Sequence, residues 1–274
     1  MRVFDDFTQQ PDPRWTQTCI GTGELQCINS VLRMSLSANA QGHYADAQID
    51  DYGTLARTQF PWRPPLSMTV RARSSLPAAT RTGDAEGKLR GTAGFGFWNY
   101  PFSARGDLLM LPEAIWFFYA SPPSNMALVP GSPGWGWKAQ VVHTMRKEAA
   151  LATLPTAFAI GRSLLSKSER DSQSAARWLQ RLSGAQEQHL DTIELTEWHT
   201  YTLEWHREYA RFQVDDRTVL DAVHPPTRAL GFVTWLDNQY AIATPRGELR
   251  FGATHTNEQW FELDHVLIEH LTGD

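Results

Sequence analysis

WHTYTLEWHREYARFQVDDRTV, at residues 198–219, predicts a series of hairpin strands with a turn at the aspartate pair 215–216. Similar short segments, bounded by Gly, Pro and Asn, recur from residue 25 to 136 and again up to residue 270. One of them, SMTVRARS at 67–74, alternates apolar and polar residues, as a strand with one buried face does. The pattern therefore predicts an all-β antiparallel sandwich or barrel rather than alternating strands and helices.

The composition is that of a globular protein with many aromatic side chains. The 274 residues are 42% hydrophobic and 20% charged, and include 11 Trp, 13 Phe and 7 Tyr. A β-sandwich of this length is commonly one domain, so residues 1–274 are expected to form a single domain. The net charge of −5 argues against a nucleic-acid partner.

The N-terminus, the longest apolar stretch and the two cysteines bear on the cellular location. The N-terminus lacks the basic and apolar regions of a secretory signal peptide, and the longest apolar stretch (149–165) is broken by Pro155 and Arg162. No transmembrane segment is therefore expected, and the predicted location is cytoplasmic. Cys19 and Cys27 flank a predicted turn, where they could pair across a hairpin, although buried free thiols are the expected state in the cytoplasm.

Residues 138–190 break the strand pattern. They contain few β-branched residues, and a stripe of apolar side chains at helical spacing predicts a helical insertion: Ala175, Trp178, Leu179 and Leu182. The block carries eight Lys or Arg and four Asp or Glu, which gives it a charge of +4 and leaves −9 for the rest of the chain. Such an insertion either caps one end of the sandwich or forms a lid over a ligand cleft.

Four segments together resemble the concanavalin A-like lectin/glucanase superfamily, and family 16 glycoside hydrolases in particular. FDDF (4–7) resembles the family's N-terminal Asp-Glu-Phe signature, and GTAGFGFWN (91–99) resembles the strand before its catalytic strand. The hairpin at 198–219 resembles F-H-x-Y-x-x-x-W…I-x-F-x-V-D-G, and ELDHVLIEH (262–270) resembles the closing V-D-Y-V-R-V-Y strand. The resemblance implies a jelly-roll of two curved antiparallel sheets with a ligand cleft on the concave face.

The catalytic strand of that family is where this chain departs from the pattern. The family carries Glu-x-Asp-x-(x)-Glu there, whereas the corresponding run 113–119 here is EAIWFFY, with Glu113 as its one acid. Retaining hydrolysis needs two carboxyl groups about 5–5.5 Å apart. Ordinary family 16 hydrolysis is therefore not expected from this strand.

Aromatic residues stand where the family has carboxylates. Alternation places Trp116 and Phe118 on one face of the strand, opposite Ile115, Phe117 and Tyr119. Either both sets serve packing, or one set enters the core and the other lines a cleft that a ligand or the insertion covers. An aromatic-lined cleft is the prediction.

Polar residues could complete such a cleft. Asp237 is the predicted general acid or base, because a carboxyl beside Trp235 could be desolvated and its pKa raised. Turn chemistry is the alternative explanation for this DNQ segment, and a solvated outer strand is the simpler one for GHYADAQIDDY (42–52). The predicted ligand-binding residues, besides Asp237, are Tyr44, Asp46, Arg71, Trp98, Asn99, Glu113, Trp116, Phe118, Asn125, Trp135, Trp137, Trp235, Asn238, Gln239 and Tyr240.

No cofactor is expected, because the sequence contains no phosphate-binding loop, HExxH, GxSxG or cysteine metal spacing. The family resemblance implies a structural calcium, for which Asp264 occupies the matching position in the last strand. Its other ligands cannot be assigned.

Three functions remain open from the sequence. The first is a ligand-binding protein or a non-hydrolytic enzyme, such as a cyclase or isomerase using one acid, that encloses an apolar or aromatic small molecule. The second is a carbohydrate-binding, lectin-like protein. The third is a divergent glycoside hydrolase whose carboxylates come from elsewhere, with Asp237 paired with Asp46 or Glu113. The oligomeric state is left open.

Overall fold

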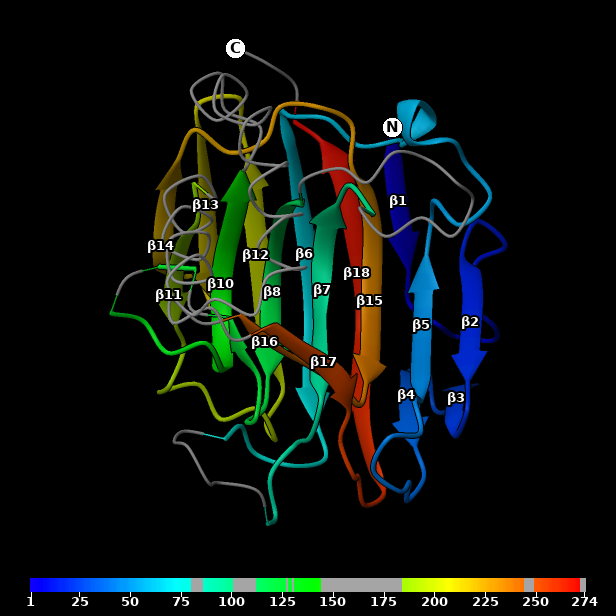
Figure 1. The fold of residues 1–274 in the computed structure, drawn as a ribbon. Helices are drawn as coiled ribbons and strands as arrows, with labels where there is room; N and C mark the ends of the chain where they lie inside the picture. Colours follow the sequence, from blue (N-terminus) through cyan, green and yellow to red (C-terminus); the bar gives the residue numbers. More distant parts are fainter. Residues whose placement is uncertain are drawn as a thin grey trace.

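The structure is a computed structural model that describes residues 1–79, 86–100, 112–126, 128–129, 131–143, 184–243 and 249–271. These residues form two large β-sheets packed face to face and one small sheet (Figure 1). Among the described residues the only helical element is the 3₁₀ turn η1 (Arg57–Gln59). The predicted all-β sandwich is confirmed.

The first sheet has eight strands in the order β14-β13-β12-β6-β18-β4-β3, with β1 also pairing with β18. Its strands are β1 (Arg2–Asp5), β3 (Gly23–Cys27), β4 (Leu32–Leu36), β6 (Leu66–Ser74), β12 (His199–Trp205), β13 (Tyr209–Val214), β14 (Arg217–Val223) and β18 (Gln259–His270). All of their pairings are antiparallel. The opening stretch 198–219 supplies β12, β13 and the start of β14, as predicted.

The second sheet has seven strands in the order β11-β10-β8-β7-β15-β5-β2. Its strands are β2 (Thr16–Ile20), β5 (Asp46–Asp50), β7 (Thr92–Trp98), β8 (Glu113–Ala120), β10 (Gly136–His143), β11 (Gln186–His189) and β15 (Gly231–Asp237). The small third sheet contains β9 (Asn125–Met126), β16 (Gln239–Ala243) and β17 (Leu249–Ala253). Because β9 follows β8 and β16 follows β15, this sheet lies where those two central strands end.

Aromatic side chains fill the space between the two large sheets. Phe95 of β7 and Phe117 of β8 each lie within 5.2 Å of Tyr201 of β12, measured between ring centroids. Phe117 also contacts Trp137 of β10 and Phe212 of β13. Such tilted and edge-on rings gain energy beyond the area that they bury. The many aromatic residues of the sequence are therefore used first to build this core.

The period-two pattern of the strands explains which side chains enter the core. On β6 the buried residues alternate with partly exposed ones, and Met68, Val70 and Ala72 point inward as the sequence predicts. On β8 the residues at 115, 117 and 119 belong to the core cluster. Trp116 and Phe118 point to the opposite side and remain partly exposed.

The predicted insertion at 138–190 is wrong at both of its boundaries. Residues 138–143 belong to β10 and residues 186–189 to β11, and these two strands pair at the edge of the second sheet. The physical reason is that Trp137, Ala139 and Val141 alternate with polar residues and supply one side of the core. The predicted helical stripe (175–182) lies outside the described residues.

The two cysteines are free, as expected, but neither is buried, contrary to the prediction. Cys19 on β2 is exposed and Cys27 on β3 is partly exposed. They belong to different sheets, because the chain crosses from one sheet to the other between β2 and β3. Within the described part of the chain, no helix has the length and apolar character needed to cross a membrane.

Candidate functional site

The face of the second sheet that points away from the core, here called the outer face, carries a continuous group of aromatic side chains at its centre. We call Trp98, Trp116, Phe118 and Trp235 the aromatic floor. The ring of Trp116 lies 5.3 Å from Phe118, 5.4 Å from Trp235 and 5.9 Å from Trp98, between centroids. Trp98, Trp116 and Phe118 are partly exposed, so the floor presents ring surface to solvent.

Two glycines on β7 make the aromatic floor possible. β7 lies between β8 and β15, and its outward positions include Gly94 and Gly96. A Cβ at Gly96 would lie 2.5 Å from the Cβ of Trp116, and one at Gly94 would lie 3.1 Å from the ring of Trp235. The rings from the flanking strands therefore meet above a stretch of β7 that has no side chains of its own.

A pair of carboxyl groups stands beside the floor. Asp46 of β5 and Asp237 of β15 face each other directly in the antiparallel register, and both point to the outer face. Directly opposed residues of antiparallel strands have Cβ atoms roughly 4.5–5.5 Å apart. The residues Asp46 and Asp237 are 5% and 6% exposed, and we call them the acid pair.

Hydrogen bonds hold Asp237 in place. Its Oδ1 accepts bonds from the backbone N–H of Thr92 at 3.2 Å, from the Thr92 hydroxyl at 2.8 Å and from the backbone N–H of Gln239 at 3.0 Å. The hydroxyl of Tyr44 also bonds to this carboxylate. Burial raises the pKa of Asp237 to about 6, and these donors limit the rise.

The carboxyl of Asp46 differs from that of Asp237 in its hydrogen bonding. Among the described residues no donor hydrogen-bonds to its carboxyl. Burial, followed by the nearby charges of Asp237 and Asp50, raises the pKa of Asp46 to about 8. At neutral pH the pair therefore holds one proton, mainly on Asp46, and one negative charge, mainly on Asp237. Two carboxyls with pKa values pushed apart are suited to act as an acid and a base or nucleophile.

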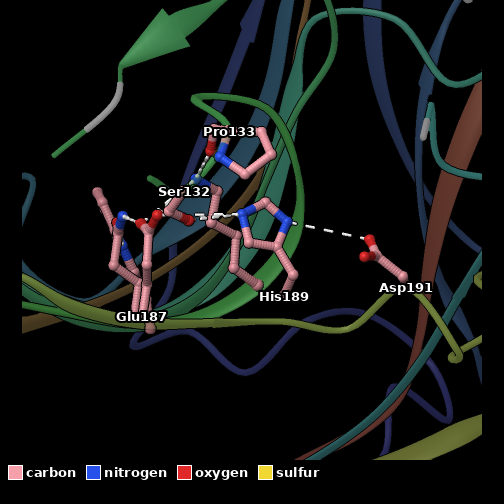
Figure 2. A network of polar contacts seen from close by, with 8 residues as sticks. Ser132, Pro133, Glu187, His189 and Asp191 are labelled. Atoms are coloured by element: carbon pink, nitrogen blue, oxygen red, sulfur yellow. Dashed lines mark hydrogen bonds and ion pairs between the residues drawn. The ribbon is translucent and has the colours of Figure 1, made fainter. Parts of the chain in front are cut away.

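A second polar group lies on the outer face at the sheet edge formed by β10 and β11 (Figure 2). The Nζ atom of Lys138 lies 3.3 Å from Glu187 and donates to the carbonyl of Pro133 at 2.9 Å. Gln140 donates to Glu187 at 2.7 Å and accepts a bond from the Trp116 indole at 2.9 Å. This edge group therefore connects directly to the aromatic floor.

The sequence prediction missed Gln140 and Glu187. Both fall in the block that was interpreted as a helical insertion, so their alternation with core residues was not used. The signal was present: Lys138 and Gln140 alternate with Trp137, Ala139 and Val141. A strand prediction for 136–143 would have placed Lys138 and Gln140 on the outer face.

Several predicted ligand-binding residues are buried among other residues of the fold. Trp137 is buried in the core, because β10 turns it inward. Asn238 is fully buried and bonds to the backbone of Ala45, His43 and Thr254. The side chain of Asn99 accepts the backbone N–H of Glu113.

Glu113 also lies away from the acid pair. It sits at the start of β8 on the core side, and its carboxylate forms ion pairs with Arg228 at 3.0 Å and His143 at 3.4 Å. Burial raises the pKa of Glu113 to about 7, although Arg228 opposes the rise. The structure therefore brings Asp237 together with Asp46 and not with Glu113.

Arg71 and Asp264 both belong to the first sheet, far from the outer face of the second. The guanidinium of Arg71 lies over the ring of Trp198 and 3.4 Å from Asp264. Asp264 also contacts His265 at 2.8 Å. Among the residues that the structure describes, no three His, Cys, Asp or Glu side chains are grouped to hold a metal ion.

The remaining candidates lie at the ends of the central strands. Asn125 forms β9, Gln239 begins β16 and is exposed, and Trp135 is partly exposed just before β10. Tyr240 lines a pocket of about 330 Å³ together with Arg90 and five other residues. Their roles as ligand contacts stay predictions.

Comparison with known proteins bears on the fold. No protein-family model matches the chain, and no curated protein matches it in sequence. Solved structures do match over nearly the whole chain. One is an endo-acting O-glycanase that initiates mucin breakdown, from the human gut microbiota, at 11% identity and a TM-score of 0.56, with 98% of this chain and 99% of that chain covered.

Two further matches are glucanases. A prokaryotic β-1,3-1,4-glucanase (lichenase) from a mouse hindgut metagenome has 12% identity and a TM-score of 0.52, with 99% of this chain and 100% of that chain covered. A laminarinase from a Flavobacterium species has 14% identity and a TM-score of 0.52, with 98% and 99% covered. The chain has the concanavalin A-like jelly-roll fold. The resemblance predicted from the sequence is thus confirmed for the fold, while the match of β8 to the family's catalytic strand stays a prediction.

Proposed function

We propose that the protein is a divergent glycoside hydrolase that binds a glycan chain across the outer face and cleaves it with the acid pair. The observation that carries the proposal is the direct opposition of Asp46 and Asp237 beside the aromatic floor. Structural likeness to glycan-cleaving enzymes supports it. The carboxylates would then come from β5 and β15 rather than from β8.

The two acids divide the reaction between them. Asp46, protonated at neutral pH, donates its proton to the glycosidic oxygen as the bond to the leaving sugar breaks. Asp237, ionised and oriented by Thr92, attacks the anomeric carbon to form a covalent intermediate. Water, deprotonated by Asp46, then releases the sugar. Opposed residues on neighbouring strands have Cβ atoms about 4.5–5.5 Å apart, from which two short aspartate side chains can reach the carboxyl separation of about 5–5.5 Å that retention requires.

The aromatic floor provides the surface on which the glycan chain binds. Partly exposed Trp and Phe rings offer flat apolar surfaces for the apolar faces of sugar rings, and the indole of Trp116 is held by Gln140. The floor lies on β8, β7 and β15, so it reaches the strand that carries Asp237. A chain bound on the floor would extend over the acid pair.

Non-hydrolytic glycan binding is the second candidate. The specific observation in its favour is the burial of both acids, which leaves only 5% and 6% of their surfaces exposed. The similar structures favour a glycan over the enclosed apolar ligand that the sequence also left open. Among the described residues, the aromatic side chains of the floor pack against one another, and Trp98, Trp116 and Phe118 are partly exposed.

The test is hydrolysis of a panel of β-1,3-glucan, mixed-linkage glucan and mucin O-glycans, the classes named for the similar structures. Asp46→Asn and Asp237→Asn are each expected to lower the rate by roughly 10²–10⁴-fold against the wild type, the usual contribution of a positioned acid or base. Asp221→Asn, an exposed aspartate of the first sheet, is the matched control. Hydrolysis that both acid-pair variants retain would remove the proposal.

A further inference from the structure

A serine, a histidine and an aspartate meet at the edge of the outer face. The Oγ of Ser132 lies 2.9 Å from the Nε2 of His189, and the Nδ1 of the same ring lies 3.9 Å from the Oδ1 of Asp191. Figure 2 shows the imidazole ring between the hydroxyl and the carboxylate. A nucleophile within hydrogen-bond reach of a base, with a third group behind the base, is the arrangement that activates a serine.

The backbone around this group makes room for the histidine ring. Gly136, the first residue of β10, has a φ of +97°, and a Cβ there would lie 3.1 Å from the Nδ1 of His189. The ring is half-buried, and Ser132 is partly exposed in the loop before β10. A substrate can therefore reach the hydroxyl while the ring stays fixed.

Burial favours the neutral form of the His189 ring. Its pKa is lowered, first by burial and then by the positive charge of Lys138, while Glu187, Asp191 and a hydrogen bond to the backbone of Pro133 oppose the change. A neutral imidazole with its proton on Nδ1, toward Asp191, leaves Nε2 able to accept the serine proton. Lys138, which contacts the carbonyl of Pro133 next to the serine, places a cation in the same group.

We propose that Ser132, His189 and Asp191 form an esterase centre, separate from the acid pair, that removes acyl groups from an ester substrate. Ser132 Oγ attacks the ester carbonyl carbon, and its proton passes to His189 Nε2. The ester C–O bond breaks, and the alcohol leaves with that proton. Water then attacks the acyl-serine as His189 accepts its proton, which releases the carboxylic acid and restores the serine. Asp191 is a positioning residue.

The position of the centre indicates the kind of ester. Lys138 pairs in register with Phe118 of the aromatic floor on one side and with His189 on the other. Two strand spacings of about 4.8 Å place His189 about 10 Å from Phe118. An acylated sugar bound on the floor could present its ester to Ser132. This choice of substrate rests on the proposed glycan function, whereas the reactivity of Ser132 does not.

The test is labelling of the intact protein with a fluorophosphonate probe, mapped by peptide mass spectrometry, together with hydrolysis of p-nitrophenyl acetate. Labelling at Ser132 is expected. Ser132→Ala should abolish it, and His189→Gln should slow it by at least about 10²-fold. Ser37→Ala, an exposed serine after β4, is the matched control. Unchanged melting curves would show that Ser132→Ala is folded.

Asp191→Asn tests whether the charge of Asp191 acts on His189, and the measured quantity is the pH dependence of labelling. Because the negative charge of Asp191 raises the pKa of His189, its removal should move the midpoint of the labelling rate against pH to lower pH. Labelling of Ser132 supports the proposal whether or not any glycan is cleaved. Absence of labelling at Ser132, or ester hydrolysis that Ser132→Ala retains, would overturn it even if glycans are cleaved.

Discussion

At the scale of single residues, the acid pair carries a cost in stability, because the buried carboxyl of Asp46 is held in its neutral form. A carboxyl with a pKa of about 8 in the folded protein binds more protons than the same group in the unfolded chain, where its pKa is about 3.9. Between these two values the folding contribution of Asp46 becomes less favourable as pH rises. Residues that lower stability in this way are often retained for function.

Asp46→Asn should therefore stabilise the protein while it removes catalysis. Each unit of pKa shift corresponds to about 1.4 kcal/mol. At pH 8 the free energy of unfolding of the variant is therefore expected to exceed that of the wild type by at least this amount. The difference should shrink as pH falls toward 4, because the wild-type acid is then protonated in both states. Urea unfolding at pH 5 and pH 8 measures it. A variant less stable than wild type at pH 8 would show that Asp46 is not a strained acid.

The sequence predicted the members of the acid pair but could not choose the pairing. Asp237 was identifiable from its position beside Trp235, and Asp46 from its alternation with Ala45 and Ala47. The partner of Asp237 depends on which strands are neighbours, and that order is set by long-range packing. The apparently solvated face of β5 is in fact buried at Asp46 and Asp50 for the same reason.

At the scale of elements, β7 shows how a strand can shape a surface by lacking side chains. Gly96 has a φ of +148°, and a Cβ there would meet the backbone of Ile115 and Trp116 at 2.6 Å. Overpacking of this kind costs about 1–3 kcal/mol. The strand thus contributes to the aromatic floor through its glycines.

Gly96→Ala is expected to lower the free energy of unfolding by about 1–3 kcal/mol and to displace the Trp116 ring. Gly42→Ala is the control, because Gly42 also has a positive φ but no atoms lie near its missing Cβ. The control should lose only about 1 kcal/mol through backbone strain. Urea unfolding and the tryptophan fluorescence spectrum report the two effects. Equal losses in both variants would contradict the packing explanation.

Strand prediction succeeded where the period was clear and failed where composition obscured it. β6 and β8 alternate visibly, and their inward and outward faces were predictable. β10 and β11 flank a stretch rich in Ala, Leu and Arg, and that composition favoured a helical interpretation of the whole block. A strand of only four residues, such as β11, has too short a pattern to stand out.

At the scale of the whole molecule, one buried carboxylate links strands of the second sheet to a distant loop. Glu113 at the start of β8 contacts His143 at the end of β10 and Arg228 in the segment between β14 and β15. The side chain of Glu113 is 1% exposed, so its charge depends on these partners. Breaking a buried pair by removing one partner is costly.

Arg228→Met should therefore destabilise the protein at pH 8 by roughly 1–2 kcal/mol, reduced from the cost for a fully buried pair because Arg228 is partly exposed. The loss should be smaller at pH 5, because Glu113, with a pKa of about 7, is then neutral. Arg211→Met, which removes an exposed ion pair with Asp221, is the control and should change stability little. A loss independent of pH would indicate lost packing rather than lost charge.

The fold itself tolerates extensive change in sequence. Similar structures share only 11–14% of residues with this chain yet match it from end to end. The alternation of apolar and polar residues in short segments bounded by turn residues was enough to predict an all-β sandwich or barrel. The arrangement of side chains on the outer face could not be predicted in the same way, because it depends on particular residues brought together from β5, β7, β8, β10 and β15.

Binding of a glycan to the aromatic floor can be measured by calorimetric titration of Asp46→Asn with oligosaccharides of the panel. The cleavage-impaired variant is predicted to bind at least one of them. Adding Trp116→Ala should weaken that binding at least about tenfold, or about 1.4 kcal/mol, because a stacking surface is lost. Adding Phe4→Ala, an exposed aromatic of the first sheet, should leave it unchanged. Absence of binding to every oligosaccharide, or equal affinity with and without Trp116, would contradict the account.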